Sequence, residues 1–314
     1  MTRPRMRVLL AVGGTMLIGV LTAIQARVNG QLGLRLDDGF VAAVISFGSG
    51  LVILVILSAA VPAGRRGMAR LVAGVRDGGI PWWMLAGGVA GALTVATQSL
   101  AVGIIGVSLF TVGYVAGQIV CGLALDRAGY GPSGAVAVTL PRVAGGALAL
   151  VAVGISFTGG ALGTVPLWML ILPFAAGIGV AWQQATNGRL RAKVGTPLTA
   201  TFVNFVAGTL VLTIAAMIRV AFAGAPEVFP SDAWLYVGGA IGVVYIFLAA
   251  ALVAYTGVLL LALGTVVGQL ATAVVLDLMW PTAASPGLIS QLAMVAVALL
   301  SVVVAMTPWR RRRT

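Results

Sequence analysis

The sequence predicts an all-α integral membrane protein with ten transmembrane helices, built as two inverted five-helix repeats with both termini in the cytoplasm (N-in/C-in). Three observations support this prediction. The 314 residues are 60% hydrophobic and 8% charged, with a mean hydropathy of +1.10. Ten apolar runs are long enough to cross a bilayer. A polar motif that ends the first of these runs returns at the end of the sixth.

The composition excludes several classes of protein and site. So few charged residues cannot coat the surface of a soluble protein of this size. The chain has no histidine, so histidine-based catalysis is ruled out, and its single cysteine, Cys121, excludes a disulfide framework and a cysteine-rich metal site. We therefore expect no metal and no cofactor. Most of the net charge of +12 lies in loops and tails, which argues against nucleic-acid binding.

The ten apolar runs are bounded by charged residues, proline or glycine clusters. A helix needs about 20 mostly apolar residues to span the hydrocarbon core. The links around Gly103 and around Tyr255-Thr256 are very short and predict tight helical hairpins. The predicted helices are 8–27, 39–61, 82–101, 104–125, 141–158, 165–187, 197–219, 234–254, 257–279 and 287–307.

Two blocks of sequence are repeated. The motif Gln-x-x-x-Asn-Gly-x-Leu occurs at 25–32 and again at 183–190, 158 residues later. The stretch 83–127 matches 234–278 at an offset of 151. The second pair of stretches shares scarce residues as well as glycines: Trp83 with Trp234, Gly87-Gly88 with Gly238-Gly239, Gly106 with Gly257, Gly117-Gln118 with Gly268-Gln269, and Leu125-Asp126 with Leu276-Asp277. A duplication of a five-helix unit explains these matches.

The basic residues predict the orientation. Lys and Arg accumulate in short cytoplasmic loops. With the N-terminus inside, only Arg27, Arg35 and Arg219 of the 19 Lys and Arg residues lie outside. Because five is an odd number, the second repeat (159–314) then enters the membrane in the opposite sense from the first (1–158). Its basic tail is expected to face anionic lipid headgroups.

The ten-helix plan and the asparagine-glycine motif resemble the drug/metabolite transporter (DMT) superfamily. More narrowly, the chain is similar to the YdcZ-type inner-membrane exporter family, in a form with both halves fused. The resemblance covers about residues 8–307. It implies a bundle in which the first, third and fourth helices of each repeat enclose a cavity for a small molecule. Small multidrug exporters of this superfamily carry a glutamate in the first helix, and 8–27 and 165–187 contain none.

We therefore expect a secondary transporter that moves a small organic solute across the cytoplasmic membrane by alternating access, because inverted repeats are a recurring transporter architecture. Export is favoured by the resemblance alone. No catalytic residues are expected, and no phosphate-binding loop points to ATP. The alternatives are a membrane-embedded enzyme acting on lipid-like substrates and a non-transporting scaffold. A monomer holds both halves, and a dimer is possible.

Polar residues inside the apolar runs are the candidates for a substrate cavity, because burying them without a partner is costly. Gln118 and Gln269 occupy the same position in the two repeats, whereas Gln98 is matched by Ala249. Gln118 and Gln269 either bind substrate or hold the two halves together. Gln98 either contacts substrate or is a helix-end side chain that reaches the membrane interface, and these alternatives stay open. Trp182 is a candidate for stacking on a ring-bearing solute. The candidate cavity residues are Gln98, Gln118, Gln269, Trp182 and Tyr114.

A second set of residues is assigned to gates. A spacing of four places both side chains of each motif pair on one helical face. The alternative for the asparagines is helix termination, because Asn-Gly tolerates the left-handed conformation. For the Ser and Asn of the second and seventh helices, the alternative is a hydrogen bond within or between helices. The gate candidates are Gln25, Asn29, Gln183, Gln184, Asn187, Ser46 and Asn204.

Asp126 and Asp277 end the fourth helix of each repeat. An acid at a helix C-terminus opposes the helix dipole, so another group must compensate it. We treat the pair as a candidate latch or coupling site. An interfacial ion pair or a hydrogen bond to a neighbouring loop is the alternative.

Overall fold

The computed structural model describes residues 3–155, 168–280 and 287–307, and these residues form helices and short links without any strand. The predicted all-helical class is confirmed. The helices are α1 (Arg3–Leu36), α2 (Gly39–Ala60), α3 (Pro62–Arg76), α4 (Gly87–Thr97), α5 (Gly103–Ala128), α6 (Leu140–Ile155), α7 (Trp168–Val194), α8 (Pro197–Ala223), α9 (Gly238–Met279) and α10 (Leu288–Ala305). Among the described residues, five helical segments are long and apolar enough to cross a membrane, and one of them runs from 233 to 276.

The two expected hairpins are sharper than the sequence suggested. The chain breaks its helical path at a single glycine in each repeat, at Gly106 inside α5 and at Gly257 inside α9. Their φ angles are +80° and +71°, a region that glycine enters without steric cost. The breaks therefore lie just after the expected positions, Gly103 and Tyr255-Thr256, because the backbone reverses where glycine permits it.

Helix α3 was not expected, since the arginine-rich stretch after α2 was treated as a link. Pro62 occupies the first turn, where its missing N–H costs nothing. Gly64 packs against Ser58 of α2, and Gly67 packs against Thr199 of α8. These close approaches fix α3 to the bundle while its arginines stay exposed.

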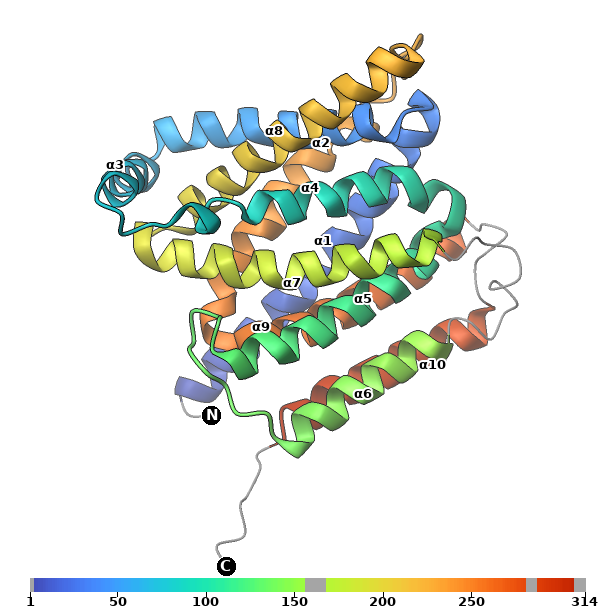
Figure 1. Ribbon diagram of the computed structural model, residues 1–314. Helices are drawn as coiled ribbons and strands as arrows, with labels where there is room; N and C mark the ends of the chain where they lie inside the picture. Colours follow the sequence, from blue (N-terminus) through green and yellow to red (C-terminus); the bar gives the residue numbers. More distant parts are fainter. Residues whose placement is uncertain (1–2, 156–167, 281–286, 308–314) are drawn as a thin grey trace, which may run out of the picture.

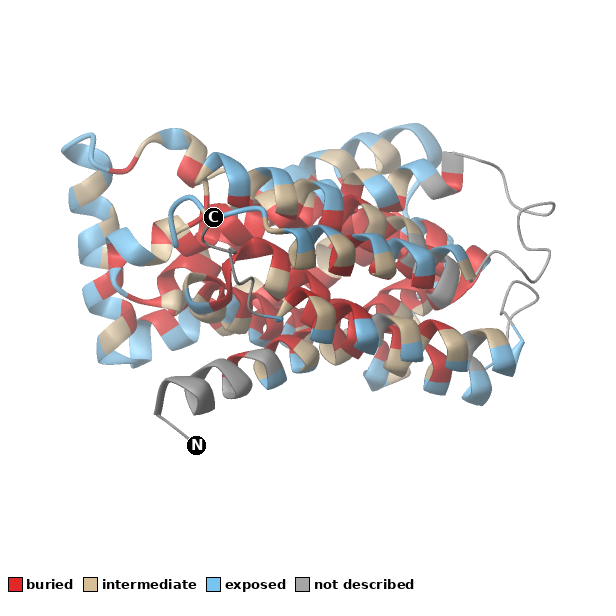
Figure 2. Ribbon diagram, turned by 90° about the horizontal axis from the view of Figure 1, so that it is seen from below, coloured by how far each residue is buried: buried red, intermediate tan, exposed pale blue. Residues whose placement is uncertain are grey.

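The helices form a layered bundle (Figure 1). Helices α2 and α8 pack together at one edge, and α6 and α10 pack together at the opposite edge. Between them, α1 packs along α9, and α5 packs along α7. Buried residues line the interfaces between helices, and exposed residues lie on the outer sides (Figure 2). Large apolar side chains such as Leu210, Phe222 and Ile289 are exposed there, as expected of a surface that faces lipid.

The two crossings at the centre are equivalent. Gly19 of α1 lies against the backbone carbonyl of Thr265 in α9, and Gly177 of α7 lies against that of Tyr114 in α5. A Cβ atom at either glycine would collide with that carbonyl. Position 177 corresponds to 19, and 265 to 114, by the offsets found in the sequence. The repeated residues thus make repeated contacts.

A second pair of equivalent contacts joins α2 and α8. The rings of Phe47 and Phe205 are 4.8 Å apart, and each lies over the glycine of the partner helix, Gly208 or Gly50. Corresponding residues of the two repeats therefore meet each other at this point.

Candidate functional site

One group of buried polar residues, which we call the second-repeat cluster, lies between α7 and α8. The amide nitrogen of Gln183 donates to Asn204 Oδ1 at 2.8 Å, and the amide nitrogen of Asn187 donates to the same oxygen at 3.0 Å. All three side chains are buried. Gly87 and Gly91 of α4 pack directly against the cluster. The four-residue spacing thus places Gln183 and Asn187 on one helical face, as predicted.

The first-repeat cluster comprises Gln25, Asn29, Ser46 and Gln98. Gln25 donates to the carbonyl of Gly238 at 2.8 Å, and Asn29 donates to Gln98 Oε1 at 2.9 Å. Ser46 and Asn204 occupy equivalent positions in the two repeats. In the first repeat, Gln98 supplies the acceptor that Asn204 supplies in the second. It lies in a π-helical turn over Gln98–Val102, a distortion common at functional sites. This difference in acceptor explains why the second repeat has no counterpart of Gln98.

Several amide atoms of these residues are buried without any hydrogen-bond partner in the described part of the chain. An unsatisfied buried polar group costs about 1–3 kcal/mol, so such atoms are natural places for water or a solute to bind. They are Gln25 Oε1, Asn29 Oδ1, Gln98 Nε2, Gln118 Nε2 and Oε1, Gln184 Oε1, Asn204 Nδ2 and Gln269 Oε1.

Gln118 is the clearest case. It is fully buried in α5, and neither its amide nitrogen nor its amide oxygen has a partner among the described residues. One turn earlier, Tyr114 is also buried and lies near Thr94 and Tyr245. The amide oxygen of Gln269, at the equivalent position in α9, also lacks a partner. A residue that joins helices would need hydrogen bonds, and the amide of Gln118 makes none to the residues that the structure describes.

Trp182 does not join these polar residues. It is partly exposed and lines an apolar groove of about 530 Å³ with Phe40, Val89, Leu93 and Val211. Consecutive helical residues point about 100° apart, so the neighbour of a buried residue can face outward. The sequence analysis assigned Trp182 to the substrate cavity, whereas in the structure it lines this apolar groove.

Asp126 joins the two halves. Its carboxylate accepts the backbone N–H groups of Val258 at 2.8 Å and Leu259 at 3.1 Å, immediately after the break at Gly257. Arg142 lies 3.5 Å from the same carboxylate. The N-terminus of the helix that restarts after Gly257 therefore supplies the compensation that the sequence required. Asp277 belongs to α9, but its side chain lies outside the described residues.

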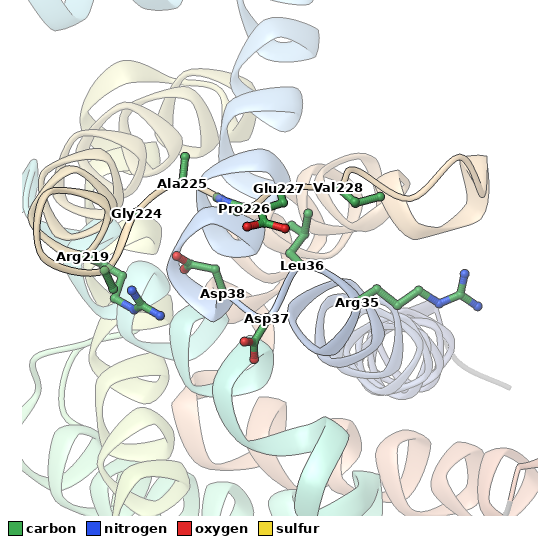
Figure 3. A pocket seen from close by; sticks show the side chains of 11 residues that line it. Arg35, Leu36, Asp37, Asp38, Arg219, Gly224, Ala225, Pro226, Glu227 and Val228 are labelled. Carbon is green, nitrogen blue, oxygen red and sulfur yellow. The ribbon is translucent and has the colours of Figure 1, made fainter.

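A charged pocket of about 350 Å³ lies between the α1–α2 link and the end of α8 (Figure 3). Arg219 points toward Asp38, while Arg35 points away from them (Figure 3) and pairs with Asp232. Asp38 also caps α2 by accepting the N–H groups of Phe40 and Val41. The sequence analysis did not single out this pocket, whose acidic residues come from links far apart in the chain.

Comparison with known proteins adds the family. Residues 10–164 and 167–306 match the model of the family DMT_YdcZ, described as "Putative inner membrane exporter, YdcZ". One solved structure, a crystal structure of a protein with 16% sequence identity, superposes with a TM-score of 0.60 and covers 95% of each chain, which shows a shared fold. No curated protein gives a significant match. With the family model matching twice and covering nearly the whole chain, the protein belongs to the YdcZ family of inner-membrane exporters.

Proposed function

We propose that this protein is a secondary transporter that exports a small organic solute across the cytoplasmic membrane by alternating access. The observation that carries the proposal is the equivalence of the contacts between the halves, in particular the crossings at Gly19 and Gly177. Two halves that meet through the same contacts can exchange inward-open and outward-open shapes around one site. Membership of an exporter family supports the direction.

The proposed orientation follows from the path of the chain. The start of α1 and the end of α10 lie at the same end of the bundle (Figure 1), together with the arginines of α3. Leaving out α3, which has 15 residues and carries four arginines, and counting α9 as two spans gives ten. In this proposal both termini therefore face the same side, the cytoplasm, and the second repeat is inverted. Basic residues gather on that side, as the positive-inside rule requires.

The solute site in this proposal is formed by the buried glutamines. Gln118 and Gln269 offer unpartnered amide atoms, and Tyr114 and Gln98 lie in the same buried interior. Amides donate and accept hydrogen bonds without charge, which suits a solute with hydroxyl or amide groups. Apart from Gln98, the residues of the two polar clusters act as gates at the two ends, and Asp126 with Asp277 acts as the latch. One chain suffices, without a cofactor and without chemistry on the solute.

The proposal is tested by measuring flux of sugars, nucleosides, amino acids and lipophilic cations through purified protein in liposomes. We expect at least one neutral solute to move. Gln118→Ala and Gln269→Ala should reduce that flux while the protein stays folded. Gln31→Ala is the matched control, because Gln31 is partly exposed and outside the clusters. No flux of any solute, or equal flux through all three variants, would contradict the proposal.

The inverted topology has its own test. In a Cys121→Ser background, single cysteines at Arg70, Lys193 and Pro230 are labelled with a membrane-impermeant reagent. Positions 70 and 193 should be labelled from one side and 230 from the other. Labelling of 70 and 193 from opposite sides would rule out the inverted repeat, and with it alternating access by this arrangement.

A further inference from the structure

A small polar pocket lies where α3 meets the α7–α8 link. It has a volume of about 180 Å³, and its charged lining residues are Arg66 and Arg70 of α3. Val194, Gly195 and Thr196 close it from the other repeat. No acidic residue is among the lining residues. The pocket therefore combines two positive charges with backbone from the neighbouring link.

The two arginines face the same way. Residues four apart lie on one helical face, so Arg66 and Arg70 are neighbours and repel each other. Arg66 donates to the carbonyl of Pro62 at 3.3 Å, and the guanidinium of Arg70 lies beside Gly195. Both side chains are exposed.

The opposite wall is the N-terminus of a long helix. Thr196 caps α8, accepting the N–H of Leu198 at 3.2 Å. The helix dipole places partial positive charge at this end. Thr199, one turn into α8, is fully buried, and its hydroxyl lacks a partner in the described part of the chain. It lies directly beside Gly67, which lines the pocket. Two arginines and the N-terminal cap of α8 thus line one pocket, and the unsatisfied hydroxyl of Thr199 lies behind Gly67.

We propose that this pocket binds a phosphate group, carried either by an anionic lipid headgroup or by a soluble phosphate ester. An arginine can hold a phosphate group through two parallel hydrogen bonds, and the positive end of the α8 dipole favours an anion. The volume admits one such group. Because α3 belongs to the first repeat and the α7–α8 link to the second, the bound phosphate bridges the two halves. The site does not depend on the identity of the transported solute.

The test measures thermal unfolding of the full-length protein. Inorganic phosphate is titrated against chloride at equal ionic strength, and phosphatidylglycerol is titrated against phosphatidylcholine in mixed micelles. We expect one of the two phosphate probes to raise the unfolding temperature in a saturable way. Stabilisation by inorganic phosphate identifies a soluble ligand, and stabilisation by phosphatidylglycerol alone identifies a lipid headgroup.

The double variant Arg66→Gln/Arg70→Gln should weaken the apparent affinity for the active probe about 30-fold, which corresponds to ~1 kcal/mol for the hydrogen bonding of each arginine. Arg76→Gln/Arg127→Gln removes the same charge from exposed positions outside the pocket and should leave the affinity within about twofold. No stabilisation by either probe, or equal weakening in the two double variants, would overturn the proposal.

Discussion

The two polar clusters occupy the same positions in the two repeats but are connected differently. In the second-repeat cluster, Asn204 accepts from both Gln183 and Asn187. In the first-repeat cluster, Ser46 stands at the position of Asn204, and its hydroxyl has no partner among the described residues. Asn29 donates its hydrogen bond to Gln98 instead. The glycine contacts around the clusters are equivalent, whereas the hydrogen bonds are not.

This difference teaches which contacts are interchangeable. A close helix crossing needs the same small residue in both repeats, because any Cβ collides with backbone. A polar side chain can change partner as long as a neighbouring helix supplies one. The close packing contacts are therefore the same in the two repeats, whereas the polar residues form different hydrogen bonds at the two ends of the bundle. The predictions below test this distinction by their effects on stability.

The largest loss of stability is expected where a charged group joins the halves. Asp126→Ala removes the acceptor of Val258 and Leu259 and leaves Arg142 without its partner. Breaking a buried pair in this way costs about 3–5 kcal/mol. Thermal and denaturant unfolding in detergent will measure it. Asp126→Asn, which keeps the side-chain oxygen, should lose less; equal losses would mean that the charge is not important.

A smaller loss is expected at the two helix crossings. Gly19→Ala and Gly177→Ala each place a methyl group against a backbone carbonyl, and overpacking of this kind costs about 1–3 kcal/mol. Gly48→Ala is the control, since a Cβ at that position meets nothing within 4 Å. Unfolding measurements should give similar losses for the two crossing variants. A loss in only one of them would contradict the equivalence of the crossings.

The clusters themselves should respond unequally. Asn204→Ala leaves two buried amide donors without their acceptor, which costs about 1–3 kcal/mol. Ser46→Ala removes a hydroxyl that makes no hydrogen bond to the described residues, so the loss should stay below about 0.5 kcal/mol. Comparing the two unfolding curves tests whether hydrogen bonding differs between the ends. Equal losses would show that the clusters are energetically alike.

A small, salt-dependent effect is expected at the exposed ion pair between Arg35 and Asp232, which joins α1 to the link before α9. Exposed pairs contribute about 0.2–1 kcal/mol and are screened by salt. Asp232→Asn should therefore lower stability slightly at low ionic strength and hardly at all at high ionic strength. A loss that persists at high salt would point to a structural role of Asp232 beyond the ion pair.

Much of the fold could be predicted from the sequence, because hydropathy fixes the length and position of membrane-spanning helices. The apolar runs predicted the all-helical class, and the repeated residues predicted which positions of the two halves correspond. Helix α3 was missed because its arginines suppress hydropathy and its glycines suggest a loop. The location of each break was also slightly wrong, since only the backbone angles show which glycine reverses the chain.

The candidate site was less predictable. The spacing of Gln183 and Asn187 correctly placed them on one face. No pattern could show that Asn29 pairs with Gln98, because that contact depends on how α1 packs against the π-helical turn Gln98–Val102. The partner of Asp126 is a pair of backbone N–H groups, which carry no sequence signal. Trp182 was assigned by depth in its helix, and depth does not determine the direction in which a side chain points.

The single-glycine breaks have a mechanical consequence. A hairpin with a flexible loop lets its two arms move independently, but one glycine leaves no spare chain between them. When the arm of α9 before Gly257 tilts, the arm after it must shift as well, and Asp126 carries that shift to α5. The helices of each half would then move together as one rigid unit and would not move independently of one another.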